Sequence, residues 1–459
     1  MGESEMKLPY GGLTVKIRIP YPMFEVSVNP VEGVRDPEVV IRDCLRQPLG
    51  LDELSGLVKK GSKVTICFEG VHVPGGYRRH VLRILLQELQ RAGVRKEDVT
   101  LVAATGVYRK PSFKELSRMI GADVAGRHTL IIHDCENQKT MVRIGETPFG
   151  DPLEVNKWVV ESDLTIILAK VIPWSFWGGY NSGSRVLSLD LTSIRTAEQY
   201  YDFDVVSNAA CNGDPYRNPL QRACWKTVNI VEDEKGSPLF FVEIVSSIKG
   251  ALLAAKAGRQ SEVEKTCWRE ADRQYLARVR ERGGLLVLGV PEVTFLGETG
   301  RDPIALLHAL TYAFRNYRNK PSILRDGIVL TAAECSEPVG RGGAAEAFKM
   351  LLKVESIEEL RKHHELQRKP ALIKAYREGE ASHPLYQFFT LYPASFILDY
   401  VDDILIFGCK SHRAAKAIRG TPIQKESEAF KIIEEQLGPD PLTIASPDYF
   451  VKGPAIQAT

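Results

Sequence analysis

The sequence predicts an α/β protein with two α/β domains, each built on a mostly parallel sheet. Three observations support this fold class. Strand-like apolar runs alternate with amphipathic helix-like runs through the first half of the chain. The alternation restarts at Gly283, after a charged helical stretch. The 459 residues are enough for two or three compact domains. We therefore expect the domain boundary between Gly258 and Gly283.

Four runs in the first half are almost continuously apolar, as strands covered on both faces should be. They span residues 63–70, 98–106, 129–135 and 164–171. Between the first two, a helix is predicted over 77–93, with leucines at helical spacing and Gly93 as its stop. Ser112 and Glu115 form a capping-box pattern at the start of the next helix.

The second half repeats this order. Strands are predicted within 283–293, 327–335, 402–409 and 441–447. Helices are predicted over 302–317 and 425–438, where apolar residues recur at helical spacing.

The composition limits the partners and the cellular location that we expect for this protein. The formal net charge is +2, so neither nucleic acid nor a membrane surface is an expected partner. No apolar run is long enough to span a bilayer, and the first residues lack the pattern of a signal peptide. None of the eight cysteines forms a CxxC pair, which favours reduced thiols over a metal site. A cytoplasmic protein is expected.

Ligands of α/β proteins bind where parallel strands end. The loops expected there are rich in glycine, aromatic and charged residues, above all 172–188, "IPWSFWGGYNSGSRVLS", which we call the cradle loop. Its tryptophans and glycines either pack around a planar ligand or cap the sheet. Arg109 and Lys110 are placed to receive an anion, and Glu69 and His72 could exchange protons. The glycines beside Arg341 could bind an anion in the same way.

Several segments together resemble the nickel-pincer lactate racemase (LarA-like) family. They are "LPYGG", "ATGVYRKPSFKEL", "HDC", "NKWVVESDLTIIL", "FWGGYNSG", "GRGGAAEAF" and "LTIASPD", and they occur in the family's order along most of the chain. The resemblance implies two lactate racemase-like α/β domains with an interdomain cleft. It assigns 1–265 to the N-terminal domain, with 441–459 returning to it, and 283–440 to the C-terminal domain.

The resemblance also implies a chemistry. In the family, a nickel-pincer nucleotide is attached through a lysine, histidines ligate nickel and move the hydroxyl proton, and cations hold the substrate carboxylate. Here the family's proton-transferring histidine is replaced by Tyr108, and the histidine that opens the cradle loop by Ser175. The lysine aligns with Arg185 and the nickel-ligating histidine with Tyr201. A second-domain lysine aligns with Leu310, close to His308, and Phe68 and Val71 replace a family aspartate and arginine.

From the residues and the resemblance together we predict three groups of site residues, and no metal ligands. The catalytic candidates are Tyr108, His72 and Glu69. The substrate-binding candidates are Arg109, Lys110, Arg185, Trp174, Tyr201 and Arg341. The cofactor-binding candidates are Ser175, Trp177, Gly178, Gly179 and Gly183.

The expected function is a racemase or epimerase of a small 2-hydroxy acid. The competing hypothesis is a non-catalytic relative that binds a small anion or a nucleotide and has lost the nickel-pincer chemistry. An NAD-dependent dehydrogenase is the weakest alternative, because no dinucleotide fingerprint is present. The resemblance implies a nickel-pincer nucleotide, but the replaced histidines and lysine leave the cofactor unassigned. The expected partner is a small anionic molecule, and a homodimer is left open.

Overall fold

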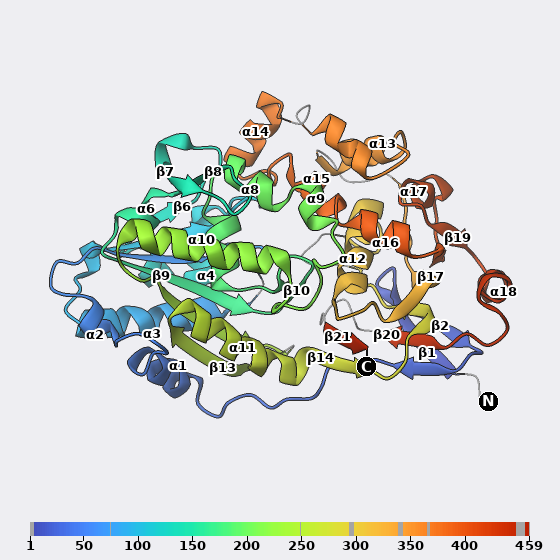
Figure 1. Ribbon diagram of the computed structural model, residues 1–459, viewed down its shortest axis with the longest axis horizontal. Coiled ribbons are helices and arrows are strands. Elements are labelled where there is room, and N and C mark those ends of the chain that lie inside the picture. Colours follow the sequence, from blue (N-terminus) through green and yellow to red (C-terminus); the bar gives the residue numbers. More distant parts are fainter. Residues whose placement is uncertain are drawn as a thin grey trace.

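The computed structural model contains two six-stranded sheets that stand side by side, each sandwiched between layers of other elements (Figure 1). The structure describes residues 4–73, 75–247, 249–292, 298–337, 343–364, 368–446 and 455–458. Nine of the ten strand pairings in the two sheets are parallel, which confirms the predicted fold class.

The first sheet has the strand order β13-β12-β9-β4-β5-β6, and only β12 and β13 run antiparallel. Its strands are β4 (Val64–Glu69), β5 (Val99–Ala104), β6 (Thr129–Ile132), β9 (Leu164–Val171), β12 (Phe240–Ser246) and β13 (Leu252–Gly258). Every residue of β4 is buried, as its continuous apolar run predicts.

Helices cover both faces of the first sheet. One face packs on α1 (Pro37–Arg46), α2 (Leu54–Leu57), α3 (Tyr77–Arg91), α4 (Phe113–Ile120) and α5 (Ala122–Ala125). The other packs on α6 (Lys157–Glu161), α10 (Pro219–Lys235) and α11 (Gln260–Tyr275), which cross in front of the sheet in Figure 1. The capping box of Ser112 and Glu115 is present at the start of α4, as predicted.

The second sheet has the strand order β19-β18-β17-β15-β20-β3. Its strands are β3 (Met23–Glu25), β15 (Gly283–Leu288), β17 (Ile323–Ala332), β18 (Asp403–Phe407), β19 (Thr421–Ile423) and β20 (Thr443–Ser446). One face is covered by α18 (Glu426–Leu437) and the hairpin of β1 (Ser4–Tyr10) and β2 (Leu13–Ile19). The other face packs on a helical layer: α12 (Pro303–Arg315), α13 (Gly343–Leu351), α15 (Tyr386–Leu391), α16 (Ala394–Tyr400) and α17 (His412–Ala417).

At both ends of the chain, the strands belong to a different sheet from the one predicted. Residues 441–459 were expected to return to the N-terminal domain, but β20 lies in the second sheet, between β15 and β3. The reason is packing on both faces of β20, because Ile444 enters the core beneath α12 and Ala445 enters the core beneath the β1–β2 hairpin. The N-terminal strands were likewise predicted to belong to the N-terminal domain, residues 1–265. They belong with the second sheet instead: β3 pairs with β20, and the β1–β2 hairpin lies close to β20 in Figure 1.

Smaller elements complete the chain. They are β7 (Met141–Glu146), β8 (Pro152–Asn156), α8 (Ile194–Tyr200), α9 (Phe203–Val206), β14 (Leu276–Val279), β16 (Tyr317–Arg318), α14 (Pro370–Arg377), β21 (Ala455–Ala458), and the 3₁₀ turns η1 (Lys96–Asp98), η2 (Gln138–Thr140) and η4 (Glu358–His363). None of the described helices has the length and apolarity that crossing a bilayer requires.

One continuous apolar core joins the two halves. It contains Val107 and Trp177 from loops of the first sheet and Leu306 and Phe389 from the helical layer of the second sheet. The loops at the carboxyl ends of β5 and β9 therefore pack directly against α12 and α15, which places the predicted site between the two sheets.

Candidate functional site

The cradle loop is internal. Every residue from 173 to 194 is buried. After β9 the chain forms a short hairpin, one helical turn and one π-helical turn. These are β10 (Pro173–Ser175), β11 (Gly179–Tyr180), α7 (Gly183–Arg185) and η3 (Val186–Asp190). Single π-helical turns are frequent at functional sites, and this one sets the position of Asp190.

The three glycines of the loop are required by internal packing. A Cβ atom on Gly183 would lie 2.4 Å from the ring of Phe241, and one on Gly179 would lie 2.6 Å from the backbone nitrogen of Pro215. Gly178 has φ +108° and Gly179 has φ +80°, conformations that side chains rarely adopt. The close approach predicted for these glycines thus exists, and its partners are protein atoms.

Ser175 attaches the cradle loop to the second half of the chain. Its hydroxyl donates a hydrogen bond of 2.7 Å to the carbonyl of Tyr312 in α12. The Tyr312 hydroxyl donates in turn to the carbonyl of Pro173. Ser175 also has φ +48°, a strained conformation for a residue with a Cβ. These contacts give Ser175 a role in fixing the loop against α12.

Two buried glutamates hold the amino end of α7. Glu243 Oε1 accepts from the backbone N–H of Gly183 at 2.7 Å, and Glu264 Oε1 accepts from the N–H of Ser184 at 2.8 Å. Both carboxyl groups are buried, and desolvation raises the pKa of each above its ordinary value. Arg185 follows directly, so the two carboxyl groups orient the residue that aligns with the family's lysine.

Five side chains meet beyond the ends of β4 and β5, and we call them the central cluster: His72, Tyr108, Arg185, Asp190 and Tyr201. The rings of His72 and Tyr108 stack with centroids 3.9 Å apart. Asp190 Oδ2 lies 3.4 Å from His72 Nε2 and 3.1 Å from Arg185 Nη2. The Tyr108 and Tyr201 phenols neighbour each other, each affects the pKa of the other, and the charges of Arg185 and Asp190 act on both. The structure therefore brings together four residues predicted from the sequence and adds Asp190.

Aromatic side chains of the cradle loop line one side of the central cluster. The Arg185 guanidinium lies 5.0 Å from the ring centroid of Trp174, a cation–π contact. The rings of Trp174 and Trp177 are 6.4 Å apart, and Trp177 meets Tyr201 edge-on at 6.0 Å. Both tryptophans are thus placed where the sequence predicted packing around a ligand.

Residues from the second half of the chain line the other side of the central cluster. His308 of α12 meets Trp177 edge-on with centroids 5.2 Å apart. Phe389 of α15 stacks on Tyr201 at 4.5 Å, and Tyr386 lies 5.4 Å from Tyr108. The central cluster is therefore enclosed by residues from both halves.

Burial fixes the protonation of these groups. Desolvation raises the pKa of the Tyr108 and Tyr201 phenols, which stay neutral near pH 7. Desolvation lowers the pKa of His308 to about 3, so its imidazole is also neutral. Burial opposes the charge of Arg185, but Asp190, Tyr108, Tyr201 and Glu69 together outweigh it and raise the pKa of Arg185. The cluster therefore contains one permanent cation.

Several polar atoms here lack a hydrogen-bond partner among the described residues. They are both ring nitrogens of His72, Nη1 of Arg185, Oδ1 of Asp190, Nε1 of Trp177 and Nε2 of His308. Buried polar atoms are normally satisfied, and an unpaired one costs about 1–3 kcal/mol. Unpaired donors and acceptors within one buried cluster are a feature expected of a site for a small polar ligand.

Glu69 lies at the end of β4, apart from this cluster. It accepts hydrogen bonds from Tyr77 and Asn181 and, at 2.9 Å, from the backbone N–H of Lys170. Asn181 Oδ1 in turn accepts from Arg185 Nε at 2.6 Å. Glu69 therefore contacts the central cluster only through Asn181.

Arg109 and Lys110 are already paired with carboxylates of the chain. Arg109 binds Glu115 through both of its terminal nitrogens, with contacts of 2.6 and 3.2 Å. Lys110 Nζ lies 2.7 Å from Asp134 Oδ2. Arg341, the remaining predicted anion-binding residue, lies outside the described residues.

Asp190 is the residue of the cluster that sequence reasoning missed. It lies five positions after Arg185, a spacing at which α-helical side chains do not face each other. The π-helical turn from Val186 to Asp190 brings the two side chains together. The available signal was an aspartate in an otherwise apolar run, "RVLSLDL", where a buried charge needs a partner.

The residues of the cluster do not fit a nickel-pincer nucleotide as the family holds it. Attachment needs a lysine amine, but Arg185 stands there, its guanidinium held by Asn181 and Asp190. The position of the nickel-ligating histidine holds Tyr201, a neutral phenol and a poor ligand. No group of three or more His, Cys, Asp or Glu side chains in the described part of the chain is arranged to hold a metal ion.

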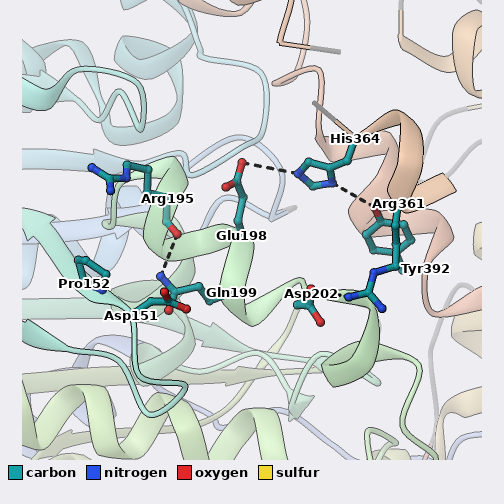
Figure 2. A pocket seen from close by; sticks show the side chains of 9 residues that line it. All are labelled: Asp151, Pro152, Arg195, Glu198, Gln199, Asp202, Arg361, His364 and Tyr392. Atoms are coloured by element: carbon teal, nitrogen blue, oxygen red, sulfur yellow. Dashed lines mark hydrogen bonds and ion pairs between the residues drawn. The ribbon is translucent and has the colours of Figure 1, made fainter. Parts of the chain in front are cut away.

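A separate open pocket of about 440 Å³ is lined by residues outside the central cluster (Figure 2). It spans α8 of the first half and the η4–α15 region of the second half. His364 Nδ1 and the Tyr392 hydroxyl share a hydrogen bond of 3.0 Å, and His364 Nε2 lies 3.7 Å from Glu198. Its lining is charged, and none of the residues predicted from the sequence belongs to it.

Comparison with known proteins agrees with this architecture. Residues 10–211 match the lactate racemase N-terminal domain family. Lactate racemase from Thermoanaerobacterium thermosaccharolyticum is 22% identical over 353 residues, covering 75% of this chain and 78% of that protein. Lactate racemase from Lactiplantibacillus plantarum is 24% identical over 156 residues, covering 34% of this chain and 36% of that protein.

Solved structures show the same fold. The lactate racemase apoprotein from T. thermosaccharolyticum superposes with a TM-score of 0.75 at 18% identity, covering 99% of this chain and all of that one. A protein from Thermotoga maritima superposes with a TM-score of 0.58 at 13% identity, covering 90% and 97%. Fold and site together define a two-sheet α/β protein with a polar cluster between its halves. Residues 10–211 thus match the lactate racemase N-terminal domain family, and the chain as a whole has the fold of the lactate racemase apoprotein.

Proposed function

We propose that this protein is an isomerase that inverts the stereocentre of a small 2-hydroxy acid, bound at the central cluster in a cleft between the two halves. The observation that supports this most directly is the group of buried donors and acceptors without partners around Arg185, His72 and Asp190. A 2-hydroxy acid offers a carboxylate and an adjacent hydroxyl, which need a cationic donor beside an acid–base group.

Arg185 is the residue proposed to hold the carboxylate. It is the one permanent cation of the cluster, and Nη1 is its terminal nitrogen without a partner. Nε and Nη2 are already held by Asn181 and Asp190, so the guanidinium is fixed before a ligand arrives. Preorganised charge of this kind costs little reorganisation on binding.

His72 is proposed to exchange the hydroxyl proton, and the hydrogen on C2 would have to leave as a hydride to an acceptor bound beside the acid and return from it to the opposite face. The His72 imidazole is stacked on Tyr108 and lies 3.4 Å from Asp190, so its orientation is fixed on two sides. Tyr108 and Tyr201 are proposed to exclude water, and Trp174 and Trp177 to pack against the ligand.

The test is chiral chromatography after incubation with single enantiomers of a series of 2-hydroxy acids, beginning with lactate. It uses the full chain, purified alone and after co-expression with enzymes that build the pincer nucleotide. Metal content and native mass of both samples are measured alongside. Loss of optical purity in either sample supports the proposal. Binding of these acids without inversion in both would contradict it and establish the non-catalytic alternative.

Two variants connect the activity to the site. Arg185→Lys keeps a positive charge but loses the guanidinium geometry, so the apparent KM for the acid should rise at least tenfold. His72→Asn removes the acid–base group and should lower kcat by about 10²–10⁴. His80→Asn changes an exposed histidine of α3 and serves as the matched control.

A further inference from the structure

A pair of cysteines lies at the carboxyl edge of the second sheet, apart from the central cluster. Cys335 follows β17 and Cys409 follows β18, which are neighbouring parallel strands. The Cys409 thiol donates to the carbonyl of Cys335 at 3.7 Å. It also donates to the carbonyl of Ser411, at 3.3 Å. The neighbouring Cys335 thiol is the main cause that lowers the pKa of Cys409, to about 7.

The backbone holds the two residues at the ends of neighbouring strands, one position apart in register. The strand pairing ends at Ala332 and Phe407, but the hydrogen bonds continue beyond it. Ala333 N donates to Phe407 O at 3.2 Å, and Lys410 N donates to Glu334 O at 2.7 Å. Adjacent strands are about 4.8 Å apart, and bridged cysteines have Cα atoms about 4.4–6.8 Å apart. Forming the bond needs side-chain rotation, with the strands left in place.

Cys335 is also held in a strained conformation. Its φ of +38° lies in the left-handed region, which residues with a Cβ seldom occupy. Its backbone N–H donates to Gly300 O at 3.1 Å, and this bond keeps the turn in place. Strain of this kind persists where the surroundings enforce it, and it is common at functional sites.

The other cysteines do not share these properties. Cys44 is the one partly exposed thiol, and burial raises its pKa to about 12. Cys67, Cys135, Cys211, Cys224 and Cys267 are buried, and burial raises their pKa values as well. Because the thiolate is the reactive form, Cys409 is the cysteine that should react first at neutral pH.

We propose that Cys335 and Cys409 form a thiol-oxidation site that closes to a disulfide when a hydroperoxide reaches it. The Cys409 thiolate attacks one peroxide oxygen, the O–O bond breaks, and the leaving hydroxide is protonated to water, which leaves Cys409 as a sulfenic acid. The Cys335 sulfur then attacks the Cys409 sulfur, the S–O bond breaks, and a second water leaves. Two thiols are oxidised by two electrons in total, and one peroxide is reduced.

The experiment treats the full chain with a small excess of hydrogen peroxide at neutral pH. Intact mass and non-reducing peptide mapping are then measured. The expected result is the loss of two hydrogens, a cross-linked peptide that contains Cys335 and Cys409, and reversal by dithiothreitol. Mapping the unmodified sequence needs no variant, so a variant that folds poorly does not decide the outcome.

Three variants locate the reaction. Cys409→Ser and Cys335→Ser should each abolish the cross-link, and the second should leave a sulfenic acid on Cys409 that dimedone traps. Cys44→Ser is the matched control and should cross-link as the wild type does. Oxidation that begins at Cys44, or added oxygen at Cys409 without a cross-link in the wild type, would overturn the proposal. The site and its test are independent of the proposed isomerase activity.

Discussion

Arg185 and Asp190 form an ion pair inside the protein, with Arg185 Nη2 3.1 Å from Asp190 Oδ2 and both side chains buried. The two residues are neighbours in space because a π-helical turn separates them. Asp190 also contacts His72, so a single carboxylate fixes both the cation and the imidazole of the proposed site. Removing this carboxylate would leave a buried guanidinium partly unpaired, and such charges are costly.

Asp190→Ala should therefore lower the free energy of unfolding by about 3–5 kcal/mol, the usual cost of breaking one side of a buried ion pair. The measurement is equilibrium unfolding in urea, followed by tryptophan fluorescence, because Trp174 lies against Arg185. The double variant Asp190→Ala/Arg185→Leu removes the unpaired charge and should recover part of the loss.

The matched control is an exposed pair. Arg83 Nη2 lies 3.1 Å from Glu38 Oε2, and both side chains are about half exposed to solvent. Arg83→Gln should change the unfolding free energy by less than about 1 kcal/mol. Equal losses for Asp190→Ala and Arg83→Gln would contradict the view that the internal pair is energetically important.

Gly183→Ala tests the packing of the cradle loop. The added methyl group would lie 2.4 Å from the Phe241 ring, which is buried in the first sheet and has no room to move. Overpacking of this kind costs about 1–3 kcal/mol. Thermal unfolding should show a lower Tm, and Gly183→Ala/Phe241→Leu should restore part of it.

Gly76→Ala is the matched control for Gly183→Ala. No atom lies within 4 Å of a Cβ built at Gly76, and its φ of −86° suits any residue. Its Tm should equal that of the wild type or exceed it slightly. If Gly183→Ala also left the Tm unchanged, the close contact with Phe241 could not be the reason for a glycine there.

Arg109→Ala addresses the ion pair with Glu115. Both side chains are 38% exposed, so solvent screens the pair despite its 2.6 Å contact. The capping box of α4 remains, since Ser112 N–H still donates to Glu115 Oε2 and Glu115 N–H to the Ser112 hydroxyl. The unfolding free energy should fall by less than about 1 kcal/mol. A loss as large as that of Asp190→Ala would show that Arg109 has a structural role that its contacts do not explain.

Local patterns predicted most of the fold. The continuous apolar runs became β4, β5 and β9, and Ser112 and Glu115 formed the expected capping box, because these features depend on neighbours in the sequence. The position of β20 could not be predicted in this way. The apolar pattern of its four residues suits a strand in either sheet. Its place in the second sheet depends on the packing of Ile444 and Ala445 against residues distant in the sequence.

For the site, too, some residues could be predicted from the sequence and others could not. A loop at a strand end identified His72, and the family resemblance identified Tyr108 and Arg185; the structure brings these three together. Charge alone did not show that Arg109 would be paired with Glu115 rather than lie in the cluster. Asp190 escaped prediction because a π-helical turn breaks the spacing on which helical patterns depend.

The pH dependence of stability should reveal the Glu243–Glu264 pair. Burial raises the pKa of Glu243 well above its ordinary value, and the neighbouring Glu264 carboxyl adds to the shift. Between the unfolded pKa near 4.5 and the higher folded pKa, the native protein binds more protons than the unfolded chain. Stability contributed by the protonated carboxyl is therefore present at low pH and is lost as the pH rises through that window.

Glu243→Gln should remove this loss. The glutamine keeps an oxygen that accepts from Gly183 N–H and, like the protonated carboxyl, is uncharged, but it has no group that titrates. The Tm of the variant should be close to that of the wild type near pH 5 and exceed it increasingly toward about pH 9. Glu262→Gln, an exposed position on the same helix as Glu264, should follow the wild type throughout. Parallel curves for Glu243→Gln and wild type would mean that Glu243 does not hold a proton in the folded protein.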